Sequence, residues 1–432
     1  SYLTVLQAVV EPRWKPQVIK LIKSAQVPAV PVWFDGANSF IFQMLGMIHP
    51  NGRTPQLPHE MLRMRGRSVR VRIGKPIAAK DIAAFGSVEQ LGRYLRAKTY
   101  ALGSGVHVKR EQFRPLRFPR KPKRVVDPVE AGAIQRELAT LDDLKLSSQA
   151  EFDLYLAPSE RIPLILREIG REREISFRAV GEGTNKRIDL DEFDLYYDHL
   201  FLWDREKQKL AGAYRIGDGV RIMERYGKRG FYTQTLFRMD RPMERILAQS
   251  FELGRSFVSP DYQKHRLPLF LLWRGLLIHL LNHPDHRYLI GPVSISSNYS
   301  RFSRGPIIEF VKQHHYDNDL ARHVHPRNRF DIKQDQGDSE ALIAASGEDL
   351  KKLDRLIADI EPRESSVPVL LKKYLLLNAR IIGFNSDPRF NDALDGLMLL
   401  DLTKLPEKTV EDLKRGMNEA IASPAPGAGP VV

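Results

Sequence analysis

Two charged residues stand three apart in an otherwise apolar run, 250-SFELGRSFVSP-260. They are Glu252 and Arg255, and a buried charge is costly unless it is paired or used in chemistry. A carboxylate can accept the proton of an attacking nucleophile, and a guanidinium can hold a substrate carboxylate or orient such a base. We therefore take both residues as catalytic candidates. The alternative is a structural ion pair at the edge of a strand.

The run has the two-residue alternation of a β-strand, which would place Glu252 and Arg255 on opposite faces. Gly254 lies between them, and a glycine inside a strand often marks a bulge. A bulge would turn both side chains toward one cleft. The sequence therefore predicts a bulged strand that carries the site.

Further candidates precede this strand. Arg173 stands four residues before Phe177, and two acids, Asp191 and Asp194, stand three apart. Arg215 comes near the end of another predicted strand. On their own, the two acids would be interpreted as surface residues of a loop and Phe177 as a core residue.

The elements that must position these residues follow from hydrophobic periodicity. Helices are predicted over 130–143, 158–171 and 267–282. Strands are predicted over 198–204, 209–217, 250–258 and 287–295. Near the end, 367–384 is predicted as a helix followed by a strand, and 393–402 as a final strand.

In chain order the candidates read R-x3-F, D-x2-D, a strand arginine and E-x2-R. This set resembles the acyl-homoserine lactone synthases and, more closely, the ornithine-lipid N-acyltransferases, often labelled hemolysin-like. Both have the Gcn5-related N-acyltransferase fold. Residues 367–402, with P-x-L-L-K-x-Y-L before D-P-x-F-N, are similar to the aminolipid-forming branch. The resemblance covers about 150–405.

The resemblance implies an α/β fold, a mixed sheet with a bulged central strand and flanking helices. It implies transfer of a (3-hydroxy)fatty acyl chain to the α-amine of ornithine or glycine in aminolipid biosynthesis. Glu252 and Arg255 would be catalytic. The substrate-binding residues would be Arg173, Phe177, Asp191, Asp194 and Arg215.

The acyl donor is suggested by the turn 259-SPDYQKHRLP-268, which has no glycine. Enzymes of this fold that use coenzyme A hold its pyrophosphate on a Gly-rich turn at a helix N-terminus. We therefore expect the phosphopantetheine thioester of acyl carrier protein as donor, docking at Lys264, His265 and Arg266. We expect no bound cofactor and no metal, and the absence of cysteine excludes disulfides and thiolate metal sites.

The beginning of the chain differs in composition. Residues 1–125 hold 23 Lys and Arg against 6 Asp and Glu, whereas the remainder holds 44 against 47. The stretches 27-VPAVPVWFDGANS-39 and 69-VRVRIGKPI-77 resemble the back half of the glycerolipid (lysophosphatidate-type) acyltransferases. The H-x4-D half of that family is not found before them, so we expect a truncated, partial α/β domain. The remnant of its motif consists of Gly36, Asn38 and Ser39.

We expect four segments along the chain. They are a partial lysophospholipid acyltransferase-like domain (1–104), a basic Pro-rich linker (105–129), an N-acyltransferase domain (130–410) and a low-complexity tail (411–432). The linker holds eight basic residues from Lys109 to Arg124 with interleaved aromatics, which suits either a solvated linker or a tether to an anionic membrane. We expect a cytoplasmic protein peripheral to the inner membrane, and no nucleic-acid partner.

Three other functions stay open. The full-length protein could be a lysophospholipid O-acyltransferase. It could be an acyl-homoserine lactone synthase, although the Trp-rich motif that supports an S-adenosylmethionine pocket is not seen after Phe177. It could also be a non-catalytic membrane-binding module whose site has decayed.

Overall fold

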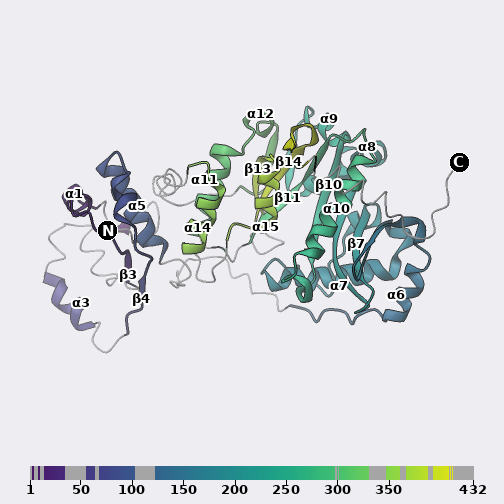
Figure 1. The fold of residues 1–432 in the computed structure, drawn as a ribbon, viewed down its shortest axis with the longest axis horizontal. Coiled ribbons are helices and arrows are strands. Elements are labelled where there is room, and N and C mark those ends of the chain that lie inside the picture. Colours follow the sequence, from purple (N-terminus) through teal and green to yellow (C-terminus); the bar gives the residue numbers. More distant parts are fainter. Residues whose placement is uncertain are drawn as a thin grey trace. The chain divides into compact units, whose positions relative to one another are not determined.

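A computed structural model describes residues 2–3, 8–9, 14–34, 55–63, 68–102, 122–296, 299, 301–329, 347–360, 366–387, 393–407, 409 and 411. The chain forms two compact units, whose elements are labelled in Figure 1. The first unit comprises Ser1–Gln112, Tyr299–His314 and Asp331–Val367. The second comprises Phe113–Asn298, His315–Phe330 and Pro368–Val432.

The first unit has a small apolar core in which Ile19, Leu91 and Leu95 are buried. Its helices are α1 (Pro16–Ser24), α3 (Leu57–Arg63), α4 (Ala79–Ala83), α5 (Val88–Ala101), α11 (Arg301–His314) and α14 (Leu350–Ile360). Its strands are β1 (Tyr2–Leu3), β2 (Ala8–Val9), β3 (Val32–Phe34) and β4 (Val71–Ile73), which form the antiparallel pairs β1–β2 and β3–β4.

The second unit contains an eight-stranded sheet in the order β13-β14-β11-β10-β8-β7-β6-β5. Its strands are β5 (Lys145–Gln149), β6 (Phe152–Pro158), β7 (Asp198–Asp204), β8 (Lys209–Asp218), β10 (Ser250–Val258), β11 (Tyr288–Ile295), β13 (Arg380–Asp387) and β14 (Ala393–Asp401). Neighbouring strands are antiparallel except β10 and β11, which are parallel. A separate antiparallel pair joins β9 (Phe237–Met239) and β12 (Val324–Pro326). The predicted mixed sheet is therefore confirmed.

Helices cover both faces of this sheet (Figure 1). On one face, α6 (Ala131–Leu138) and α7 (Pro163–Ala179) share a core with Phe201 and Ala213. On the other, α10 (Leu267–Leu281) lies so close that a Cβ on Gly275 would come within 2.4 Å of Leu154. The remaining helices of this unit are α8 (Gly219–Tyr226), α9 (Met243–Ala248), α12 (Asn318–Ala321) and α15 (Val369–Leu376).

The helix predicted over 158–171 is displaced along the chain. Residues 159–161 form a short 3₁₀ turn, and α7 then runs from Pro163 to Ala179. Proline fits the first helical turn because its missing N–H has no partner there in any case. The displacement places Arg173 and Phe177 inside the helix. No helix in the described part of the chain is both long and apolar enough to cross a bilayer.

The centre of the sheet is irregular at β10. This strand pairs with β11 only over Ser250–Glu252 against Tyr288–Ile290, after which the two strands diverge. On its other side the ladder to β8 is interrupted between Gly254 and Phe257. The predicted bulge is thus present, but its left-handed residue is Arg255 (φ +50°) and not the glycine.

Candidate active site

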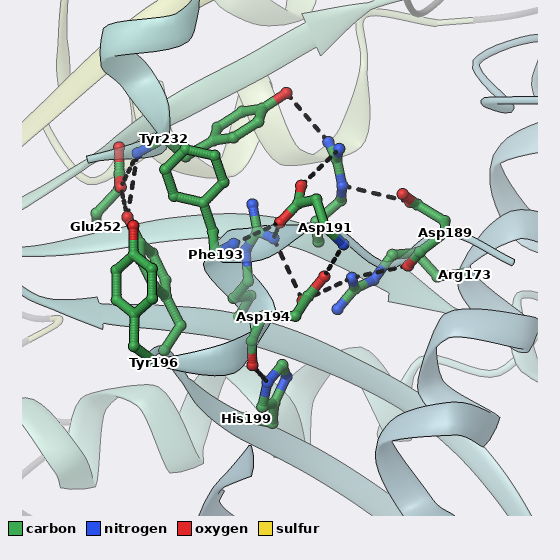
Figure 2. A network of polar contacts seen from close by, with 12 residues as sticks. Arg173, Asp189, Asp191, Phe193, Asp194, Tyr196, His199, Tyr232 and Glu252 are labelled. Atoms are coloured by element: carbon green, nitrogen blue, oxygen red, sulfur yellow. Dashed lines mark hydrogen bonds and ion pairs between the residues drawn. The ribbon is translucent and has the colours of Figure 1, made fainter. Parts of the chain in front are cut away.

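Three arginines and three aspartates form a largely buried arginine–aspartate network, consisting of Arg173, Arg215, Arg255, Asp189, Asp191 and Asp194 (Figure 2). Arg173 of α7 donates through Nη1 to Asp194 Oδ1 at 2.9 Å and to the carbonyl oxygen of Asp189 at 3.2 Å. Arg215 of β8 lies 2.5 Å from Asp191 Oδ1 and 3.2 Å from Asp194 Oδ1. These ion pairs compensate the buried charges, which would otherwise be costly to remove from water.

The two acids that stand three apart also fix the turn they belong to. Asp194 Oδ2 accepts a hydrogen bond from the backbone N–H of Asp191 at 2.8 Å, and Asp191 Oδ1 accepts one from Phe193 N at 3.0 Å. Burial would raise the pKa of Asp194, but the guanidinium groups of Arg173 and Arg215 hold it well below its usual range. The turn therefore presents ionised carboxylates in fixed positions.

Arg255 joins the network from the bulge of β10. Its Nε lies 3.3 Å from Asp189 Oδ2 and its Nη2 lies 3.4 Å from Asp191 Oδ2. Its Nη1 donates to the hydroxyl of Tyr232 at 3.2 Å, and the guanidinium lies 5.0 Å from the centre of that ring. Gly254 is paired with Arg215, so regular alternation would have turned the next side chain away from this face. The bulge turns the Arg255 side chain to the face that carries the network.

Glu252 is buried on the same face, and its carboxylate accepts three hydrogen bonds. Oε1 accepts from the backbone N–H of Thr233 at 2.7 Å. Oε2 accepts from Tyr232 N at 2.9 Å and from the Tyr197 hydroxyl. Burial raises the pKa of Glu252, whereas the hydrogen bonds from Thr233 and Tyr197 oppose this rise. Tyr232 links the two catalytic candidates, because its N–H binds Glu252 and its hydroxyl binds Arg255 (Figure 2).

A cavity of about 140 Å³ lies where β10 and β11 diverge. Its walls include Gly254 and Arg255 of β10 and Pro292 and Ser294 of β11. Sites for drug-sized ligands typically enclose about 300–1,000 Å³. The enclosed space therefore suits the small reacting part of a substrate, not the length of a fatty chain.

The cavity reaches from one face of the sheet to the other. Tyr232 and Arg255 line it on the side of α7. Tyr214 and Tyr374 line it on the side of α10, where the Tyr374 ring lies 5.1 Å from that of Trp273. Two substrates could thus meet between the diverging strands from opposite faces.

The same cavity is lined by three carboxyl groups that were not predicted from the sequence: Glu182, Asp387 and Asp395. Burial, together with the neighbouring Asp387, raises the pKa of Asp395 to about 8. Burial also raises the pKa of Glu182 to about 7. Asp395 stands in the apolar run 393-ALDGLMLLDL-402, so the rule that selected Glu252, a charge inside an apolar strand, would have found it too.

Two parts of the chain match known families. Residues 173–273 match the family described as Acetyltransferase (GNAT) domain, and residues 4–108 match the family described as Acyltransferase.

Curated relatives cover more of the chain. The Glycine N(alpha)-acyltransferase of Phocaeicola vulgatus is 29% identical over 299 residues, which is 66% of this chain and 90% of that protein. The Glycine N(alpha)-acyltransferase of Bacteroides thetaiotaomicron is 30% identical over 299 residues, covering 66% and 87%. The chain belongs to the N(alpha)-acyltransferase family.

A more distant member of this acyltransferase family is the L-ornithine N(alpha)-acyltransferase of Rhodobacter capsulatus, 28% identical over 231 residues, covering 51% of this chain and 78% of that protein. Among solved structures, the crystal structure of the AHL synthase LasI covers 34% of this chain and 74% of its own at 17% identity. Its TM-score is 0.25.

The acyltransferase brings together six of the residues selected from its sequence: Arg173, Asp191, Asp194, Arg215, Glu252 and Arg255. Phe177 lines the cavity and also packs against the core beneath α7. Lys264, His265 and Arg266 are exposed just before α10. Gly36, Asn38 and Ser39 lie outside the described residues. The catalytic, substrate-binding and docking roles of all these residues stay predictions.

No group of three or more His, Asp or Glu side chains among the described residues is arranged to hold a metal ion. Three histidines near the end of α10 instead surround Phe251. The ring of His286 stacks on Phe251 at 3.9 Å, and that of His279 lies 4.6 Å from it.

Proposed function

We propose that this enzyme transfers a (3-hydroxy)fatty acyl chain from acyl carrier protein to the α-amine of a small amino acid, glycine or ornithine, in aminolipid biosynthesis. The relatives named as glycine and L-ornithine N(alpha)-acyltransferases support the acceptor. The observation that carries the proposal is the small cavity between β10 and β11, which has a guanidinium and carboxylates on its walls.

The charges around the cavity match an amino acid. A free amino acid carries a carboxylate and an ammonium group a few bonds apart. Arg255 offers a cation that is fixed by Asp189, Asp191 and Tyr232, and a planar guanidinium suits a carboxylate well. The three carboxyl groups of the cavity offer the complementary acidic side, where the ammonium group would lie.

The chemistry is an acyl transfer from sulfur to nitrogen. The neutral amine attacks the thioester carbonyl, a C–N bond forms, and the C–S bond then breaks to release the thiol of the carrier. The intermediate carries an oxyanion, which fixed backbone N–H groups stabilise. The β10 bulge supports this role, because the ladder to β8 is interrupted between Gly254 and Phe257, beside the cavity.

The sequence singled out Glu252 as the base, acting directly or through a water molecule. Both of its oxygens accept hydrogen bonds from the protein, and it is not among the residues that line the cavity. A proton could reach it only through neighbours such as Tyr197. Its proposed contribution is therefore to hold the Tyr232–Thr233 backbone, and with it the wall that carries Arg255.

The donor and the location are further parts of the proposal. Acyl carrier protein is acidic, and Lys264, His265 and Arg266 offer it an exposed basic segment before α10. The excess of basic residues in 1–125 suits the anionic surface of the inner membrane, where the product would be released. The enzyme would thus be a peripheral protein on the cytoplasmic side.

A second acyl transfer is suggested by the match of residues 4–108 to the family described as Acyltransferase. The sequence of this part resembles glycerolipid acyltransferases, so the corresponding candidate is O-acylation of a lysophospholipid by the full-length protein. This activity would be separate from the cavity between β10 and β11.

An acceptor screen tests the proposal. The protein is incubated with 3-hydroxyacyl carrier protein or with the matching acyl-coenzyme A, and with glycine, ornithine, lysine, glycyl-serine or a lysophospholipid, and products are identified by mass spectrometry. We expect an N-acylated glycine or ornithine from the carrier protein. Acylation of the lysophospholipid alone would contradict the proposal and place the chemistry in the N-terminal part.

A further inference from the structure

The amine of an amino acid must lose a proton before it can attack, and the acidic side of the cavity is where this group would lie. Asp395 and Asp387 are 5% and 3% exposed, and they come from the adjacent strands β14 and β13. Glu182 follows α7 and completes the set. We call these three residues the acidic wall.

Asp395 has one oxygen available. Its Oδ1 accepts a hydrogen bond from the Ser294 hydroxyl at 2.9 Å, and Ser294 is its register partner on β11. Its Oδ2 accepts no hydrogen bond from the described residues. The arrangement orients the carboxyl and leaves one oxygen for a ligand.

A second, independent feature of the cavity points to a polar ligand. Tyr214 is 1% exposed and lines the cavity. Ser256 and Trp273 are polar neighbours of its hydroxyl, but the hydroxyl makes no hydrogen bond of normal geometry among the described residues. Buried hydroxyl groups are nearly always satisfied, so such a group indicates a missing partner. With Arg255, the cavity therefore presents a cation, an unpaired hydroxyl and the acidic wall.

We propose that Asp395 is the general base of this acyltransferase, and that Asp387 and Glu182 help it to hold the acceptor's ammonium group opposite Arg255. This inference rests on the proposed function. It moves the proton acceptor from Glu252 to a residue that lines the cavity. Asp395 would then be a catalytic residue and Glu252 a positioning residue.

The protons balance. One proton of the ammonium passes to Asp395 Oδ2, which gives the neutral amine that attacks the thioester. After the C–N bond has formed, a second proton passes from nitrogen to the departing thiolate, and the third stays in the amide N–H. Asp395 then returns its proton to solvent.

The electrostatics favour the first step. An ordinary aspartate is far too weak a base to deprotonate an amine, but burial and Asp387 raise the pKa of Asp395 to about 8. Glu182 acts in the same direction, whereas the hydrogen bond from Ser294 and the charge of Arg255 act in the opposite one. Proton transfer from the amine to Asp395 is thus much less unfavourable than transfer to an ordinary aspartate.

The test compares two acceptors with the full chain. The amino acid needs a base, whereas hydroxylamine is largely unprotonated at neutral pH and does not. Asp395→Asn keeps the size of the side chain and an oxygen for Ser294. Asp401→Asn is the matched control, since Asp401 lies on the same strand but pairs with Arg287 outside the cavity.

We expect Asp395→Asn to lower kcat for the amino acid by about 10²-fold or more, with a smaller change in KM. We also expect it to keep hydroxamate formation near the wild-type rate. The wild type should show a rise of kcat with pH around 8, and the variant should lose this rise. Asp401→Asn should match the wild type in all three readouts.

The outcomes separate the two proposals. If the wild type acylates no amino acid, the proposed function fails and this inference fails with it. If the wild type is active and Asp395→Asn keeps its kcat, or loses both activities equally, Asp395 is not the base. If Glu252→Gln alone loses the amino acid reaction and keeps the hydroxylamine reaction, Glu252 is the base and the inference is overturned.

Discussion

Glu252 is surrounded by donors that only an acceptor with two free oxygens can satisfy. Two of them are the backbone N–H groups of Tyr232 and Thr233, and the third is the Tyr197 hydroxyl. An ionised carboxylate fits this site because it offers acceptors only. The residue therefore has a structural reason to be a glutamate, whatever its part in catalysis.

We predict that Glu252→Gln lowers the free energy of unfolding by about 1–3 kcal/mol, because the new amide NH₂ would face a backbone N–H and leave a donor unsatisfied. Acyl transfer should fall as well, since Tyr232 also holds Arg255. Chemical denaturation and a turnover assay check both effects. Glu192→Gln, at an exposed position, is the control and should stay within about 0.5 kcal/mol. An unchanged unfolding midpoint in Glu252→Gln would contradict this account.

The sequence pointed to the arginines and aspartates of the network because their spacing resembles that of a known family. It did not show their partners. Asp194 is paired with Arg173 and Arg215, which stand 21 residues before and after it. Asp395 was missed although the rule that selected Glu252, a charge inside an apolar strand, would have found it. Its neighbouring acids Asp387 and Glu182 could not be predicted, because only folding brings them to it.

The divergence of β10 and β11 creates the cavity. Just before the two strands diverge, a glycine lets their backbones approach each other closely. Gly291 of β11 faces the backbone of β10, and a Cβ at this position would lie 2.2 Å from the carbonyl oxygen of Leu253. Gly254 on β10 has no such restriction, because a Cβ added there would lie 4.0 Å from its nearest neighbours, which are atoms of the Arg215 side chain.

We predict that Gly291→Ala destabilises the protein by about 1–3 kcal/mol, because backbone atoms must shift to accept the methyl group. Gly254→Ala is the matched control for stability and should be tolerated. Thermal or denaturant unfolding of both variants checks this prediction. Equal stabilities would mean that the two strands are not packed as closely as described.

The positions of the strands were predictable and the local geometry was not. Apolar runs identified β7, β8, β10, β11 and β14, because a strand buried on both faces leaves a clear pattern. The left-handed backbone fell on Arg255, although a glycine stood beside it. The contacts of Arg255 with Asp189 and Asp191 offset the local strain, and such contacts are invisible in one strand's sequence.

The distribution of charge over the whole chain leads to a prediction about membranes. The excess of Lys and Arg in residues 1–125 should bind the intact protein to vesicles that contain phosphatidylglycerol, but not to phosphatidylcholine alone. Binding should weaken strongly in 1 M salt, where the Debye length falls to about 3 Å. Sedimentation with vesicles measures this. Tight binding to RNA without binding to anionic vesicles would contradict the prediction.

We propose that the acceptor amino acid binds in the cavity between β10 and β11, with its carboxylate on Arg255. The most direct test is the ratio of kcat/KM for the preferred amino acid to that for its amide, which lacks the carboxylate, in the wild type and in Arg255→Gln. We predict a ratio of about 10² or more in the wild type, because the amide cannot form the charge-assisted pair that the carboxylate makes with the guanidinium, and a ratio near one in the variant. A wild-type enzyme that acylates both acceptors equally, or a variant that keeps the preference, would show that the acceptor does not bind there.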